Sequence, residues 1–169
     1  MSADGLVLPV PFIRQPDTQL CWATCCSMVL RANGKRIDPC AIAAQVFGEA
    51  GCPNEPALPE DGYYPYDVPF EGPLEGYFGM DTIVDEITVW RRPVEVYIQY
   101  DDPAPGGAPA HVVLIIGVYQ GDAVLVHDPL SDRPLWCTHE ELVQGFGLGP
   151  WTHTYHRIGG ALGHAPLTS

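Results

Sequence analysis

Apolar side chains recur at helical spacing in three stretches of the first ninety residues. The first stretch begins at Cys21 and predicts a helix that stops at Asn33 and Gly34, a pair that favours the left-handed end of a helix. The second stretch begins at Pro39, because proline is common at the first helical position. The third covers residues 80–89. We therefore expect three helices in the N-terminal part of the chain.

The later part of the chain changes to the period of β-strands. Residues 94–100 alternate as in a half-buried strand, and residues 111–118 are almost continuously apolar, as in a strand buried on both faces. Shorter strands are predicted at residues 123–126 and 151–158. A capping box that begins at Thr138 predicts a short helix between these two strands. We expect the consecutive strands to pair antiparallel.

Helices that precede a sheet indicate an α+β fold. We expect a helical part over about residues 15–90, packed on an antiparallel sheet over about residues 91–160. Residues 6–13 contain two prolines and predict an extended lead-in or an edge strand. Because 169 residues, 46% of them hydrophobic, suffice for one core, we predict a single domain over residues 1–169.

Residues 48–79 follow neither period and predict a long connection. The segment contains seven acidic residues, no Lys or Arg, and six aromatic residues. Loops of this length are uncommon in compact domains unless they have a binding role. We therefore expect either a wall of the substrate site or an acidic loop whose aromatic side chains pack on the core.

The charge balance restricts the partners. Lys and Arg number 8 against 21 Asp and Glu, so the formal net charge is -13. This charge repels phosphate backbones and anionic membranes, and we expect neither nucleic acid nor a membrane as a partner. The N-terminus lacks the pattern of a secretory signal, and no stretch approaches the roughly 20 apolar residues of a membrane span. We expect a cytoplasmic protein by default, with signal-independent secretion as the alternative; no oligomeric state is predicted.

Six cysteines are distributed unevenly along the chain. Cys21, Cys25 and Cys26 lie within one predicted helix, where close neighbours cannot easily form disulfides. This placement favours a reduced protein, with Cys25 and Cys26 in the core. Cys40 and Cys52 are the pair that could join in an oxidising compartment.

Cys21 stands where a polar segment changes into an apolar helix. The N-terminus of a helix offers unpaired N–H groups and a partial positive charge, and both favour a thiolate over a thiol. We expect the polar residues before Cys21, among them Asp17 and Thr18, to cap this helix. Cys21 is therefore the candidate nucleophile.

A nucleophilic thiol needs a base, and imidazole is the usual one near neutral pH. Among six histidines, His111 begins the long apolar strand directly after a loop, so its ring can lie at the rim of the sheet. A hairpin from His111 returns the chain to Asp128, which can then orient the ring. The sequence therefore predicts a site made of Cys21, His111 and Asp128.

A rival interpretation is a metal site at His127, Asp128, Cys137 and His139, whose side chains suit zinc. His127 and Asp128 are adjacent, however, and neighbours on a strand point to opposite faces. We therefore expect no metal and no cofactor.

Several motifs extend beyond these three residues. Gln15 stands six positions before Cys21, Cys21 opens the sequence Cys-Trp-Ala, Arg92 opens Arg-Pro-Val, His111 opens His-Val-Val-Leu-Ile-Ile-Gly, and Asp128 lies within His-Asp-Pro. With these motifs the chain resembles compact papain-like cysteine peptidases, in particular the bacterial groups that include bacteriocin leader peptidases and plant-pathogen effector proteases. The resemblance covers most of the chain, from Gln15 to about Phe146.

The resemblance implies that Gln15 donates to the oxyanion, with Gln19 as the alternative because it is nearer in sequence. It also implies a hydrolase that cleaves peptide or amide bonds of a protein or peptide substrate through a thioester. A basic substrate and the role of a bacterial effector or toxin are further expectations. The same site could serve a deamidase, a transglutaminase or a peptidoglycan amidase. The other class is a catalytically silent binding module on a papain-like scaffold.

Overall fold

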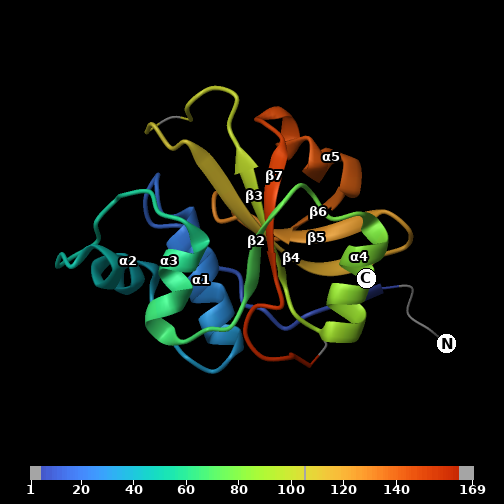
Figure 1. The fold of residues 1–169 in the computed structure, drawn as a ribbon, viewed down its shortest axis with the longest axis horizontal. Coiled ribbons are helices and arrows are strands. Elements are labelled where there is room, and N and C mark those ends of the chain that lie inside the picture. The colour runs from blue at the N-terminus through green and yellow to red at the C-terminus, as the bar shows by residue number, and fades with distance from the viewer. Residues whose placement is uncertain (1–4, 105, 164–169) are drawn as a thin grey trace.

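The computed structural model describes residues 5–104 and 106–163. Seven strands form one antiparallel sheet. Figure 1 shows a group of helices beside this sheet. The α+β class predicted from the order of the elements is therefore confirmed. None of the helices in the described ranges is long and apolar enough to cross a membrane.

The elements follow the predicted order closely. They are β1 (Gly5–Val7), α1 (Cys21–Ala32), α2 (Pro39–Phe47), α3 (Pro59–Tyr63), η1 (Tyr64–Tyr66), β2 (Glu71–Glu75), α4 (Met80–Asp85), η2 (Glu86–Trp90), β3 (Val94–Gln99), β4 (Ala110–Tyr119), β5 (Ala123–His127), β6 (Leu135–Thr138), α5 (His139–Val143), η3 (Gly145–Gly147) and β7 (Trp151–His156). α4 continues directly into η2, and together they form the third predicted helix. The capping box at Thr138 is present and starts α5.

α1 is the most deeply buried helix, because its first ten residues, from Cys21 to Leu30, are all buried. It packs against α2, α3 and β4. No side chain in the described part of the chain caps its start, where Leu20 is the N-cap residue. The predicted capping by the polar lead-in is therefore wrong: the Asp17 carboxylate accepts from the backbone N–H of Thr18 instead. The first N–H groups of α1 are consequently left for other acceptors.

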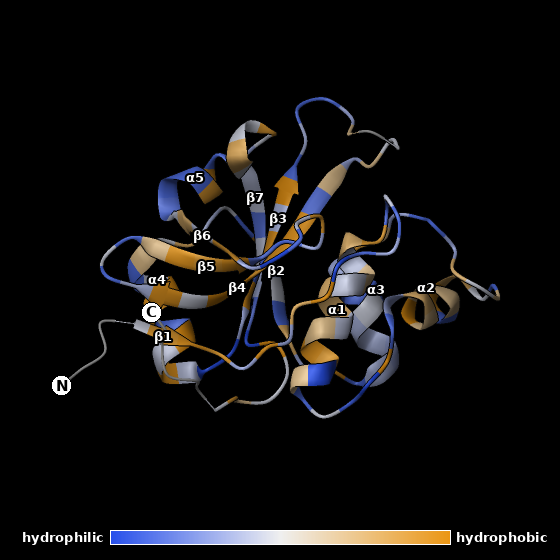
Figure 2. Ribbon diagram, turned by 180° about the vertical axis from the view of Figure 1, so that it is seen from behind, coloured by the Kyte–Doolittle hydropathy of each residue, from blue (hydrophilic) through white to orange (hydrophobic). Residues whose placement is uncertain are grey.

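β4 lies at the centre of the sheet, whose order is β2-β7-β3-β4-β5-β6. Its first nine residues are buried, and Figure 2 shows it among the hydrophobic strands. The first residues of β4 pair with β3. The last residues of β4 pair with β1. Residues 6–13 thus contribute an edge strand at their start, as one of the two predicted alternatives. The beginning of β4 and the first turns of α1 lie side by side, since the Cys25 thiol donates to the Val112 carbonyl and Cys21 interacts with His111.

The predicted long connection over residues 48–79 is wrong. This segment forms α3, η1 and β2, and β2 pairs with β7 at the edge of the sheet. Its aromatic residue Tyr63 is completely buried, and the Tyr63 ring packs against Phe70 with 5.7 Å between the ring centroids. The sheet therefore also takes one strand, β2, from the part expected to be helical. β6 was not predicted either.

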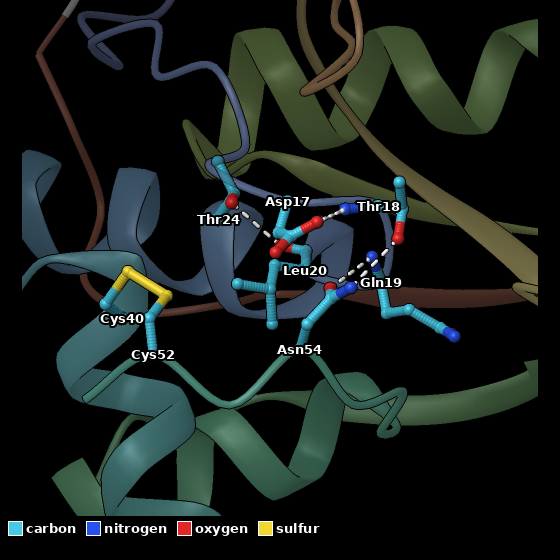
Figure 3. The surroundings of a disulfide bond; sticks show 8 residues. All are labelled: Asp17, Thr18, Gln19, Leu20, Thr24, Cys40, Cys52 and Asn54. Carbon is cyan, nitrogen blue, oxygen red and sulfur yellow. Dashed lines mark hydrogen bonds between the residues drawn. A yellow bond between two sulfur atoms is a disulfide. The ribbon is translucent and has the colours of Figure 1, made fainter. Parts of the chain in front are cut away.

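Cys40 at the start of α2 forms a disulfide with Cys52, which lies 12 residues later (Figure 3). The expectation of a fully reduced protein is therefore wrong for this pair. In the described part of the chain Cys21, Cys25, Cys26 and Cys137 are free. Cys25 and Cys26 are completely buried, as predicted.

Candidate active site

Three chain segments meet at the candidate site: the start of α1, the start of β4 and the turn after β5. His111 Nε2 lies 2.6 Å from Asp128 Oδ1. The Cys21 side chain is close enough to His111 to interact with its imidazole. Because Nε2 is occupied by Asp128, Nδ1 is the ring nitrogen left for the Cys21 sulfur. Cys21 is 7% exposed and His111 3% exposed, so the contacts are largely shielded from water.

The pairing of the strands explains why these residues meet. His111 is the second residue of β4 and faces Ile98 of β3 in the register. β5 returns antiparallel to β4, and the Leu114–His127 pair is the last before Asp128. The turn after Asp128 is held by the backbone N–H of Leu130, which donates to the Asp128 carboxylate at 2.9 Å. The predicted hairpin therefore delivers Asp128 to the His111 ring.

The electrostatics of the site favour a protonated imidazole. Burial lowers the pKa of His111, but the hydrogen bonds to Asp128 and Cys21 and the charges of these groups outweigh burial and raise it from 6.5 to about 10. Burial raises the pKa of Asp128, and the hydrogen bond and charge of His111 reverse this effect, so the net pKa is lowered. An imidazolium held between a carboxylate and a sulfur is the charge pattern that stabilises a thiolate.

Tyr100 is a site residue that the sequence did not reveal. Its ring stacks on His111 at an angle of 8° between the ring planes and 6.2 Å between the centroids. Burial, with the charges of Cys21 and Asp128, raises the pKa of Tyr100 to about 12, so it stays neutral. Tyr100 follows the last residue of β3, and nothing in the alternating pattern of this strand separates it from a packing residue.

The two candidate glutamines lie in different surroundings. Gln15 is buried, its carboxamide Nε2 donates to the Asp17 carbonyl at 2.6 Å, and its Oε1 has no partner in the described residues. The Gln19 side chain donates instead to the carbonyl oxygen of Gly106 at 2.8 Å. Gly106 has a positive φ of 86°, and an added Cβ would lie 2.8 Å from the hydroxyl of Thr18, so only glycine fits here. Gln19 therefore helps to attach the β3–β4 loop to the lead-in of α1.

Two hollows flank the Cys21–His111 pair. A slot of about 20 Å³ is lined by Cys21 together with Trp22, Pro56 and Ala57. A larger cavity of about 520 Å³ is lined by His111 and by the loop between β3 and β4. The slot is too small for a bulky side chain, whereas the cavity falls within the range of ligand pockets.

The segment after the disulfide reaches the start of α1. The side chain of Asn54 accepts from the backbone N–H of Gln19 at 2.8 Å and donates to the Thr18 hydroxyl at 2.9 Å (Figure 3). The indole N–H of Trp22 donates to the Glu55 carbonyl at 3.0 Å. The predicted substrate wall in residues 48–79 is thus reduced to the short stretch that also supplies the lining of the slot.

The four side chains of the rival metal site form separate contacts. His127 Nε2 lies 2.8 Å from the Val10 carbonyl and His139 Nε2 lies 2.7 Å from the Phe78 carbonyl. Burial, with the charge of Glu141, raises the pKa of Cys137 to about 12. Across the described ranges, no group of three or more His, Cys, Asp or Glu side chains is arranged to hold a metal ion. The residues are thus not assembled into the rival site.

Comparisons with known proteins identify the family and the fold of the chain. Residues 7–141 match the Peptidase_C39 like family. A solved structure, that of a candidate C39-like peptidase from Bacillus anthracis, has the same fold with a TM-score of 0.60 at 16% identity, over 97% of this chain and 99% of that chain. No curated protein sequence matches. Because the family match spans more than half of the sequence, the chain belongs to the Peptidase_C39 like family and is a papain-like cysteine peptidase.

Proposed function

We propose that the protein hydrolyses peptide bonds with Cys21 as nucleophile, His111 as proton carrier and Asp128 as the group that orients the imidazole. The observation that carries this proposal is the buried His111 ring, which contacts Asp128 Oδ1 at 2.6 Å through Nε2 and also interacts with the Cys21 side chain. A histidine that only filled the core would not need both a thiol and a carboxylate as partners.

The reaction begins when the Cys21 thiolate attacks the carbonyl carbon of the scissile bond. The carbonyl oxygen becomes an oxyanion, which the backbone N–H of Cys21 and the Gln15 carboxamide stabilise. The C–N bond then breaks, and the His111 imidazolium gives its proton to the leaving amine. A water molecule next attacks the thioester while His111 takes its proton, and the carboxylic acid leaves Cys21 as a thiolate.

The start of α1 supports the proposed oxyanion site. No described side chain caps this helix, so its first N–H groups are open to a substrate oxygen. The partial positive charge of the helix end favours the negative charge that develops there. Gln15 is buried in the lead-in to the same helix, and its carboxamide already donates one hydrogen bond with Nε2. The second hydrogen of this NH₂ group is available for the oxyanion.

Alkylation with iodoacetamide near neutral pH tests the ion pair. We expect Cys21 to be labelled first, because burial raises the pKa of Cys25 and Cys26 well above the ordinary value and raises that of Cys137 to about 12. Labelling of Cys21 should slow markedly in His111→Ala, while a Cys137→Ala control keeps the wild-type rate. Equal labelling of Cys21 in wild type and His111→Ala would contradict the proposal.

A peptide library separates the reactions that share an acyl-enzyme. Mass spectrometry after incubation with wild type and Cys21→Ala reports peptide cleavage, deamidation and crosslinks together. Cleavage that needs Cys21 supports a peptidase, whereas release of ammonia without cleavage would select a deamidase or transglutaminase. Full biological function in Cys21→Ala would instead support a binding module. The effector or toxin role and the place where the protein acts remain predictions.

A further inference from the structure

The cavity beside His111 has no role in the chemistry described so far. We propose that it is the subsite for the first residue on the leaving-group side of the scissile bond, and that it takes Lys or Arg. This inference rests on the proposed roles of Cys21 and His111. It assigns the substrate a basic residue at a defined position.

The two hollows adjoin different members of the reacting pair. Cys21 lines the slot, His111 lines the cavity, and Ala108 and Ala110 line both, so this short stretch separates them. In the proposed reaction the acyl half of the substrate stays on the Cys21 sulfur, and the amine half receives its proton from His111. The half that leaves must therefore begin beside His111, at the cavity.

The cavity combines apolar walls with an acidic rim. Tyr100, Ala104 and Leu148 contribute to the walls, and Asp101 and Asp102, which also line the cavity, are exposed to solvent. Among the residues that the structure describes, no Lys or Arg lines the cavity. Lys and Arg side chains have this same division, because their aliphatic stems pack on apolar surface while the charged group stays at the water boundary. An acidic side chain at this position would meet two like charges.

Backbone hydrogen bonds hold this cavity open without a ligand. The N–H of Asp101 donates to the Leu148 carbonyl at 3.0 Å, which joins the β3–β4 loop to the segment after η3. The N–H of Ala104 donates to the Ala108 carbonyl at 3.2 Å within the loop. Gly149 permits the close approach, because a Cβ added there would lie 1.9 Å from the Gln99 carbonyl oxygen. A pocket fixed in this way loses little entropy when it binds.

The test measures which residue follows the scissile bond. A proteome-derived peptide library is digested with wild type, and the best cleaved sequence is then synthesised with Lys, norleucine or Glu at the first leaving-group position. We expect kcat/KM in the order Lys, norleucine, Glu. In Asp101→Asn/Asp102→Asn the ratio of Lys to norleucine should fall about threefold, as expected for exposed charge pairs. Asp81→Asn/Asp85→Asn removes two exposed acidic groups from α4 and should keep the wild-type ratio.

Charge reversal provides an independent measurement. Asp101→Lys/Asp102→Lys should prefer Glu over Lys at the same position, a gain that loss of folding cannot produce. An unchanged ratio of Lys to norleucine in both double variants would overturn the subsite. Cleavage by wild type without a basic preference would overturn only this inference and leave the proposed function intact. Absence of any cleavage that depends on Cys21 would refute both.

Discussion

The backbone N–H of Gln15 donates a hydrogen bond to the carbonyl oxygen of Pro129 at 2.8 Å. Pro129 directly follows Asp128, so this bond connects the lead-in of the nucleophile helix to the turn that holds the orienting carboxylate. Gln15 therefore occupies a position that is fixed from two sides, by its backbone to this turn and by its side chain to the Asp17 carbonyl. A donor whose position is fixed in this way is what the proposed oxyanion site requires.

Gln15→Ala should lower kcat/KM by about a hundredfold, the loss typical for one oxyanion donor. Steady-state kinetics on a cleaved peptide measures this change. Gln19→Ala is the matched control: it removes the hydrogen bond to Gly106 and should have a much smaller effect. A greater loss in Gln19→Ala than in Gln15→Ala would transfer the donor role to Gln19. Iodoacetamide labelling of Cys21 should stay normal in both variants, because alkylation forms no oxyanion.

Asp128→Asn should change the pH dependence of the reaction. The hydrogen bond and charge of Asp128 help to raise the pKa of His111 to about 10. The imidazolium is present below this pKa and is lost above it. Because Asp128→Asn makes the rise in the His111 pKa smaller, the alkaline limb of kcat/KM should move to lower pH. We expect a displacement of about one unit or more.

Profiles of kcat/KM against pH for wild type and Asp128→Asn measure this displacement. Asp132→Asn removes an exposed carboxylate from the same region of the chain, where it pairs with Arg14, and should leave the limb in place. An alkaline limb that stays at the wild-type pH in Asp128→Asn would show that Asp128 does not act on His111.

Glu95 should make the protein less stable as the pH rises. It is completely buried in β3, and the Tyr63 hydroxyl donates to one of its oxygens. Burial raises its pKa from 4.5 to about 8, and the charge of Glu60 adds to this while the bond from Tyr63 opposes it. Between these two pH values the folded state binds a proton that the unfolded state releases. The free energy of unfolding therefore falls through this window.

Glu95→Gln removes this titration. At pH 9 the variant should exceed wild type in unfolding free energy, by an amount on the order of a few kcal/mol. At pH 4.5 the difference should nearly vanish. Urea unfolding at both pH values tests this, with the exposed Glu75→Gln as control. An equal difference between variant and wild type at both pH values would contradict a neutral Glu95.

Removing the disulfide in Cys40→Ala/Cys52→Ala should lower the unfolding free energy by about 3 kcal/mol, as expected for a short closed loop. The bridge stands two residues before Asn54, which contacts the lead-in of α1, so kcat/KM should also fall. Urea unfolding and peptide kinetics measure the two effects. Cys137→Ala removes a free thiol instead and should alter neither. Wild-type kinetics in the double variant would show that the bridge does not support the site.

The periodicity of apolar residues predicted most of the fold, because the buried faces of the long helices and strands are visible as apolar patterns in the sequence. α1 begins at Cys21 as expected, and β4 matches its continuous apolar stretch. Residues 48–79 could not be predicted in this way. α3 has only five residues and depends on contacts with α1, where Gly62 lies close to the Cys26 sulfur. β2 is an edge strand that pairs with β7, so its pattern is not that of a buried strand.

The residues of the candidate site likewise divide into those that the sequence predicted and those that it did not. Cys21, His111 and Asp128 follow from element ends, where a helix start, a strand start and a hairpin return must meet. Tyr100 and Asn54 could not be found, because their roles come from stacking and from hydrogen bonds across 35 residues of chain. Such contacts depend on the three-dimensional path of loops, which local patterns do not encode.

The Cys40–Cys52 bridge and the Cys21 thiol require opposite redox conditions within one molecule. Cys21 can attack only as a reduced thiol, whereas the bridge exists only in its oxidised form. Strong reductant protects the nucleophile and opens the bridge; strong oxidant keeps the bridge and converts the nucleophile to an inactive sulfenic acid or beyond. Activity should therefore be highest at an intermediate redox poise, and the thiol concentration in an assay becomes a variable that sets the measured rate.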